Sequence, residues 1–176
     1  MDKGIIKQIA LIGYRGCGKS TVGTLLAQKL DLPFYSLDQE IEKKEAKSIN
    51  QIVQEKGWDY FRKIETEVLK SFEKKEGVLD CGGGIIEKET NRRILRKIPL
   101  VVFLKASLSV IHERLKDKTD RPSLTGSKDF LKEIQEVYER RIPLYEKTAH
   151  FIVEADEEAE DVAEMIRVLT IEENPF

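Results

Sequence analysis

The residues of this chain with the clearest chemical spacing lie between Gly13 and Ser20, where the sequence reads GYRGCGKS. This stretch fills the phosphate-loop pattern G-x-x-x-x-G-K-[ST], in which glycines let backbone N–H groups wrap around phosphates. Lys19 offers a positive charge to the outer phosphates, and Ser20 offers a hydroxyl to Mg²⁺. An apolar run precedes the stretch and a helix pattern follows it, which argues against a chance glycine-rich turn. We therefore predict a nucleoside triphosphate site made by Gly16, Cys17, Gly18, Lys19, Ser20 and Thr21.

The composition is that of a single ordinary domain. Of 176 residues, 40% are hydrophobic, and 30 basic against 32 acidic residues leave a net charge of -2. This balance argues against binding of nucleic acid or of a membrane surface through bulk charge. We see no signal peptide, no stretch long enough to span a membrane, and too few cysteines for a disulfide framework. We expect one cytoplasmic domain over residues 1–176, and a redox link between Cys17 and Cys81 is the less favoured alternative.

The hydrophobic pattern predicts an α/β fold. Short apolar runs indicate strands at 4–12, 34–37, 77–81, 100–104 and near 151–153. Helical spacing is found at 21–30, 40–45, 48–57, 60–74, 87–97, 107–116 and 130–141, and around Val162, Ile166 and Leu169. Alternation of the two implies right-handed βαβ units, and hence three layers with a central five-stranded parallel sheet between helices. Residues 117–128 break the pattern and are expected to form a mobile lid.

The predicted strand ends bring separated stretches together. In parallel α/β sheets the active site lies at the carboxyl ends of the strands. The phosphate loop, Asp38 and Gly82–Gly84 each come just after a predicted strand. We therefore expect these three stretches to converge on one crevice.

Five further stretches are informative because of their residues and their order along the chain. They read FYSLDQEIE at 34–42, GWDYFRKIE at 57–65, GGG at 82–84 followed by NR at 91–92, RPSL at 121–124 and RIPLY at 141–145. Over nearly its whole length the chain thus resembles the shikimate kinase family. The resemblance implies a P-loop kinase fold and Mg²⁺-dependent transfer of the γ-phosphoryl group of ATP to the 3-hydroxyl of shikimate, in aromatic amino acid biosynthesis. We expect a monomer that acts on these small molecules, without nucleic acid or membrane as a partner.

The resemblance also implies an acceptor site, centred on the segment at about 38–65. Arg62 and Arg141 would hold the carboxylate of shikimate, which suits the planar fork of a guanidinium group. Gly83 and Gly84 would offer backbone N–H groups to the hydroxyls of shikimate. Without the family pattern, both arginines would be interpreted as solvated helix charges.

Two acidic residues accompany the arginines. Asp38 matches the family residue that contacts the acceptor hydroxyl, and would orient or deprotonate it. We expect orientation to dominate, because phosphoryl transfer is largely dissociative. The alternative for Asp38 is an ordinary helix N-cap. Glu65, one helical turn after Arg62, either holds the arginines in place or forms an ordinary surface pair.

Two later arginines match nucleotide contacts of the family. Arg121, inside the expected lid, matches the arginine that reaches the transferring phosphoryl group, and with Lys19 and Asp38 it completes the expected catalytic set. Arg114 matches an arginine that lies over adenine, and a solvent-facing position is the alternative. The family's basic loop after the last strand is acidic here, with the sequence EADEE at 154–158.

Two further positions depart from the family. The first aspartate of its Asp-x-Asp pair, which helps to hold Mg²⁺, is replaced by Ser36. Asp80, at the end of the next strand, lies where many phosphate-loop proteins place an aspartate of the magnesium shell. Our hypothesis is that Ser20 and Asp80 serve the metal, and the alternative is that Asp80 only terminates the strand. Trp58 stands where the family often has Glu, and is interpreted as a packing residue, with an altered substrate pocket as the less favoured view.

Two other functions stay open at this point. One is a different small-molecule kinase of the same fold, such as a gluconate or nucleoside monophosphate kinase. The other is a kinase-like module that binds nucleotide without catalysis. Joint retention of the expected catalytic and arginine positions argues against the second, and a panel of acceptors would distinguish the first.

Overall fold

The computed structural model describes residues 4–118, 123–126 and 128–171. Its centre is a sheet of five strands in the order β2-β3-β1-β4-β5, with every neighbouring pair parallel. The strands are β1 (Gln8–Ile12), β2 (Phe34–Ser36), β3 (Gly77–Asp80), β4 (Leu100–Lys105) and β5 (Phe151–Glu154). The predicted five-stranded parallel sheet is therefore confirmed.

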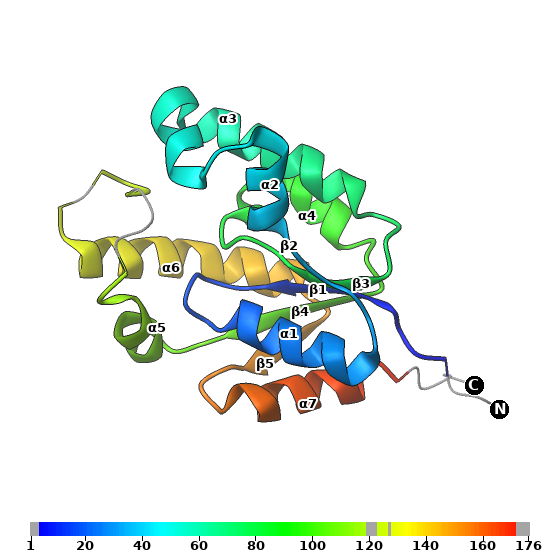
Figure 1. Ribbon diagram of the computed structural model, residues 1–176. Coiled ribbons are helices and arrows are strands. Elements are labelled where there is room, and N and C mark those ends of the chain that lie inside the picture. The colour runs from blue at the N-terminus through cyan, green and yellow to red at the C-terminus, as the bar shows by residue number, and fades with distance from the viewer. Residues whose placement is uncertain (1–3, 119–122, 127, 172–176) are drawn as a thin grey trace.

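Helices cover both faces of this sheet. They are α1 (Lys19–Leu30), α2 (Leu37–Glu45), α3 (Ile49–Ser71), the 3-10 helix η1 (Ile85–Glu87), α4 (Glu89–Leu95), α5 (Leu108–Leu115), α6 (Phe130–Thr148) and α7 (Ala159–Leu169). Figure 1 shows α1 and α7 side by side on one face, α4 and α6 on the other, and α2 packed against α3. Among the described residues, none of these helices has the length and apolar character needed to cross a membrane.

The central strands are apolar because both of their faces are covered. Residues 9–12 of β1 and 100–104 of β4 are each no more than 1% exposed. Such continuous apolar runs are typical of parallel strands between two helical layers. Burial of this surface is the main favourable term in folding, and it fixes the ends of β1 and β4 relative to each other.

Helix boundaries differ substantially from the predicted ones in two places. Gly57 has φ 80° and ψ 171°, so the predicted break is real, although α3 continues on both sides of this kink. The helix expected to end at Arg141 runs through Pro143 to Thr148. A proline inside a helix costs about 3 kcal/mol, but buried α6 residues on both sides of it, such as Val137 and Tyr145, hold the helix in place.

Three smaller differences concern element ends. The first strand begins at Gln8 rather than at residue 4, and the helix expected at 87–97 is a 3-10 turn followed by the short α4. Ser36, not Asp38, is the N-cap of α2, because the Ser36 hydroxyl accepts a hydrogen bond from the Gln39 N–H at 3.4 Å. The N-cap interpretation of Asp38 is therefore wrong, and its carboxylate lies in the first turn of the helix instead.

The strand register places the chemistry-bearing residues at one edge. Asp80 pairs with Leu11 on β1 and with Ser36 on β2, so the ends of three neighbouring strands are level. The phosphate loop follows β1, α2 follows β2 and the three glycines follow β3. The predicted convergence of these stretches is thus a direct result of the register.

Candidate functional site

Two pockets open at the carboxyl ends of the strands. The larger has a volume of about 670 Å³ and lies over the phosphate loop, between α5 and the start of α7. The smaller has a volume of about 30 Å³ and lies between α3, α6 and the turn at 123–126. The pockets share four lining residues, namely Arg15, Asp38, Gly82 and Gly83. A group bound in one pocket can therefore meet a group bound in the other beside Asp38.

The side chain of Lys19 folds back onto the backbone of the phosphate loop. Gly16 and Gly18 have φ values of 81° and 95°, which a residue with a Cβ rarely adopts. Lys19 is only 8% exposed, and its Nζ donates to the carbonyl oxygens of Gly13 at 2.8 Å and Tyr14 at 3.1 Å. These bonds hold the ammonium group at the floor of the larger pocket. All six predicted phosphate-loop residues line that pocket.

Ser20 and Asp80 form a close pair beside the loop. The Ser20 hydroxyl donates to Oδ2 of Asp80 at 2.6 Å, and both residues line the larger pocket. Mg²⁺ in phosphoryl-transfer sites is held by one or two protein oxygens together with substrate phosphates. The donor set fits Mg²⁺.

The far end of the larger pocket combines basic and acidic residues. Arg114 is exposed at α5, and its Nη1 donates to the Gly16 carbonyl at 3.0 Å, so this side chain lies on the phosphate loop. The acidic loop at 155–158 also lines this pocket. Its Asp156 accepts a hydrogen bond from the Ser107 N–H at 2.8 Å, which ties the loop to the start of α5.

The three glycines after β3 are the point where the residues predicted to bind the acceptor meet. A Cβ built on Gly82 would lie 2.9 Å from Oδ1 of Asp38. One built on Gly84 would lie 2.1 Å from Nη2 of Arg62, and one on Gly83 would lie 3.6 Å from Nη1 of Arg141. Asp38, Arg62 and Arg141, which are 24 and 79 positions apart in the sequence, are thus brought to one backbone turn. At Gly82 and Gly84 the lack of a Cβ lets Asp38 and Arg62 come this close to the backbone.

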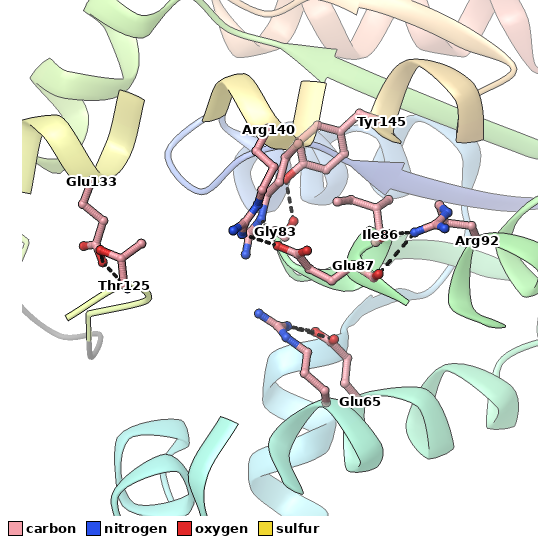
Figure 2. Close-up of polar contacts among 11 residues, drawn as sticks. Glu65, Gly83, Ile86, Glu87, Arg92, Thr125, Glu133, Arg140 and Tyr145 are labelled. Atoms are coloured by element: carbon pink, nitrogen blue, oxygen red, sulfur yellow. Dashed lines mark hydrogen bonds and ion pairs between the residues drawn. The ribbon is translucent and has the colours of Figure 1, made fainter. Parts of the chain in front are cut away.

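The pair of Arg62 and Glu65 is part of the site and not a surface pair. Nη1 of Arg62 donates to Oε1 and Oε2 of Glu65 at 2.9 and 3.1 Å, and Glu65 is 1% exposed (Figure 2). Burial raises the pKa of Glu65, the nearby charge of Asp38 raises it further, and the ion pair with Arg62 opposes both effects. Glu65 therefore holds Arg62 against the glycine turn, which decides between the two interpretations of this residue.

Arg141 reaches the smaller pocket from α6. It is 3% exposed, its guanidinium lies 5.9 Å from the ring centre of Tyr14, and its Nε donates to Glu87 at 2.7 Å. On the same helix Tyr145 is fully buried and donates its hydroxyl proton to the Gly83 carbonyl (Figure 2). Burial raises the pKa of Tyr145, so this hydroxyl keeps its proton and can donate. The solvated-charge interpretation of Arg62 and Arg141 is wrong.

The turn at 123–126 closes the smaller pocket. Glu133 is 3% exposed and accepts hydrogen bonds from the Ser123 hydroxyl and the Thr125 N–H, both at 2.7 Å. Trp58 lines the pocket, and its Nε1 donates to the Ser123 carbonyl at 3.3 Å. These bonds place Leu124 in the wall of the pocket. Trp58 packs at the substrate helices, as its packing interpretation predicts.

Some site residues differ from the predicted set. Arg121, and residues 119–122 and 127 of the expected lid, lie outside the described residues. Arg15, which lines both pockets, was not predicted, although an arginine at a variable position of the phosphate loop is a signal that sequence reasoning could have used. Glu87 and Glu133 were also missed, because their partners are brought near only by the fold.

Comparison with known proteins identifies relatives of this chain in sequence and in structure. A sequence model described as shikimate kinase matches residues 15–170. The shikimate kinase of Aquifex aeolicus is 40% identical over 95% of this chain and 97% of its own length. A structure of shikimate kinase from Acinetobacter baumannii in complex with shikimate has a TM-score of 0.88 and 33% identity, over 93% of this chain and 92% of that one.

A more distant likeness concerns the fold alone. A gluconokinase from Sinorhizobium meliloti has a TM-score of 0.54 and 16% identity, over 93% of this chain and 91% of that one. This level of similarity carries no argument for gluconate as the acceptor. The family model and the 40% identical relative, in contrast, both cover most of the sequence. The chain therefore belongs to the shikimate kinase family.

Proposed function

We propose that the chain transfers the γ-phosphoryl group of ATP to the 3-hydroxyl of shikimate, which yields shikimate 3-phosphate and ADP for aromatic amino acid biosynthesis. Membership of the family makes it an ATP-dependent kinase that uses Mg²⁺. The observation that carries the assignment of the site is the pair of pockets that meet at Asp38. A phosphoryl donor fits the first pocket, and an anionic acceptor fits the second, which has two arginines in its wall.

The acceptor carboxylate is held by Arg62 and Arg141 in this proposal. Both guanidinium groups lie beside the glycine turn, and each is fixed by a carboxylate, Glu65 or Glu87. A guanidinium held by one carboxylate keeps further N–H groups for a second. Gly83 and Gly84 then offer backbone N–H groups to the ring hydroxyls, and the hydrogen bond from Tyr145 to the Gly83 carbonyl keeps this turn in place.

Asp38 lies where the two substrates meet, and its role is to orient the acceptor hydroxyl. Its carboxylate lies close to Gly82, and the residue lines both pockets. Since the transition state of phosphoryl transfer is loose, alignment of the hydroxyl with the phosphorus contributes more than full removal of its proton. Asp38 accepts the hydroxyl proton as the new P–O bond forms.

Lys19 and the backbone N–H groups of the loop stabilise the charge of the phosphates, and Arg114 serves the adenine end. Mg²⁺, when bound, would neutralise charge on the outer phosphates. Ser20 and Asp80 would hold it, and Asp80 supplies the carboxylate that Ser36 lacks, from the neighbouring strand at the same register position. A contribution of Arg121 and of a lid at about 117–128 stays a prediction from the sequence.

The working unit in this proposal is one chain of one domain in the cytoplasm. The described residues of a single chain line both pockets, so a second copy is not needed to complete the site. Cys17 and Cys81 are both buried and free, which suits a reducing compartment.

The test is steady-state release of ADP with shikimate, gluconate or a nucleoside monophosphate as acceptor. We expect release that depends on shikimate and on Mg²⁺, with the other acceptors near the rate without acceptor. Preference for another acceptor would favour a different small-molecule kinase. Calorimetric binding of shikimate without turnover would favour the non-catalytic module.

A further inference from the structure

Glu87 is a charged residue that contacts Arg141 from outside the lining of the acceptor pocket. It is the last residue of η1, directly after the glycine turn. Arg92 of α4 fixes this turn by donating from Nη1 to the carbonyl oxygens of Ile86 at 2.6 Å and Glu87 at 3.2 Å. The backbone that carries Glu87 is thus held by α4, while its side chain points to α6 (Figure 2).

One carboxylate oxygen of Glu87 serves two arginines. Oε1 accepts from Nε of Arg141 at 2.7 Å and from Nη2 of Arg140 at 2.9 Å. The Arg140 side chain is 58% exposed, whereas that of Arg141 is 4% exposed. Burial alone would raise the pKa of Glu87, but the hydrogen bond from Arg141 and the charges of both arginines outweigh it and lower this pKa. The carboxylate is therefore ionised at neutral pH.

The atom of Arg141 that Glu87 binds decides how this guanidinium is presented. A guanidinium is planar, and its five N–H groups point in fixed directions. With Nε held by Glu87, the Nη1 end lies next to Gly83 in the acceptor pocket. A carboxylate ligand can then bind the end opposite to Glu87 with good geometry.

We propose that Glu87 is a positioning residue that turns the guanidinium of Arg141 toward the carboxylate of the acceptor. The inference rests on the proposed function, because it takes Arg141 as a ligand of that carboxylate. A positioning role and charge repulsion predict opposite effects of the removal of Glu87 on binding of the acceptor. A negative charge near an anionic acceptor should repel it, so a role through charge alone would mean that removal of Glu87 improves binding. A positioning role means that removal weakens binding.

The experiment compares the unsubstituted chain with Glu87→Gln and Glu87→Ala in full steady-state kinetics. Gln keeps the size of Glu and removes the charge, so it serves if the Ala variant folds poorly. The matched control is Glu146→Gln, since Glu146 is on the same helix as Arg141 and pairs with Lys105 at 3.2 Å outside both pockets. A second acceptor, shikimate with its carboxylate converted to a carboxamide, isolates the contact with the carboxylate.

For both Glu87 variants we expect the KM for shikimate to rise about tenfold, as for a weakened charge-assisted hydrogen bond. The KM for ATP, kcat and the KM for the carboxamide should each change less than about twofold. An unchanged or lower KM for shikimate, or an equal rise in Glu146→Gln, would overturn the inference while leaving the proposed function intact. No shikimate-dependent turnover in the unsubstituted chain would overturn both.

Discussion

The two pockets of the site are built on different principles. The longest run of residues in the wall of the nucleotide pocket is 15–22, and Lys19 in this run contacts backbone atoms, namely the Gly13 and Tyr14 carbonyls. The acceptor pocket is lined by side chains from five separate parts of the chain. Its arginines are held by two carboxylates, Glu65 and Glu87. Recognition of phosphate therefore depends on local backbone shape, and recognition of the acceptor depends on the whole fold.

The pockets also differ in size and in the charged residues that line them. The nucleotide pocket has about 670 Å³ and the acceptor pocket about 30 Å³. Arg62 and Arg141 line only the acceptor pocket, whereas Lys19 and Arg114 line only the nucleotide pocket. Substitutions in the acceptor pocket should thus affect KM for shikimate much more than KM for ATP.

The largest effect is expected at the junction of the pockets. Asp38→Asn keeps the size of the side chain but removes the charge that orients the acceptor hydroxyl. We expect kcat to fall about 10²- to 10³-fold, with little change in the KM for ATP. Calorimetry should show that the variant still binds ATP. A kcat within threefold of the unsubstituted chain would contradict the role of Asp38.

Arg62→Lys tests the acceptor pocket alone. Lysine keeps the charge but cannot bind Glu65 and a second carboxylate in one plane. The KM for shikimate should rise about 10- to 100-fold, and the KM for ATP should stay within about twofold. Arg114→Lys is the matched change in the nucleotide pocket, and should alter only the KM for ATP, by a few-fold. If either variant changed the KM for shikimate and the KM for ATP equally, the assignment of one substrate to each pocket would be contradicted.

Asp80→Asn tests the metal side of the nucleotide pocket. If Asp80 supports Mg²⁺, the Mg²⁺ concentration for half-maximal turnover should rise about tenfold at saturating substrates. The Ser20 hydroxyl can still bond to the amide oxygen, so the fold should persist, and thermal unfolding checks this. An unchanged Mg²⁺ dependence would mean that Asp80 only terminates β3.

The smallest expected effect is on the pH dependence of Tm. Because folding raises the pKa of Glu65, the folded chain binds this proton more tightly than the unfolded chain. Stability is then lost as the pH rises from the ordinary carboxyl pKa through the raised value. Glu65→Gln lacks this titration, so its Tm relative to the unsubstituted chain should increase over that window. The exposed Glu164→Gln is the control, and a Tm difference for Glu65→Gln that is constant with pH would contradict the raised pKa.

The sequence predicted the nucleotide side better from its residues than the acceptor side. Eight consecutive residues define the phosphate loop, and the apolar runs of β1 and β4 reflect burial on both faces, so both signals are local. Arg62 and Arg141 carry no local signal and were assigned only through the family pattern, whereas Asp38 also follows the end of a predicted strand. Their meeting at the glycine turn depends on the register of β2 and β3 and on the placement of α6.

The missed features share one physical cause, which is tertiary contact. Glu87 is 54 residues from Arg141, and no spacing in the sequence connects them. The continuation of α6 through Pro143 runs against helix propensity and follows from burial of the residues around it. This continuation keeps Arg141 and Tyr145 on one helix, both directed at the glycine turn.

The most direct test of the central claim, that the two pockets bring a phosphoryl group and an acceptor hydroxyl together, is ³¹P NMR of the reaction products. With ATP, Mg²⁺ and shikimate, we predict a new phosphate monoester signal that grows in equal amount with ADP. Release of inorganic phosphate with no monoester would contradict the claim, because water and not the acceptor would then have received the phosphoryl group.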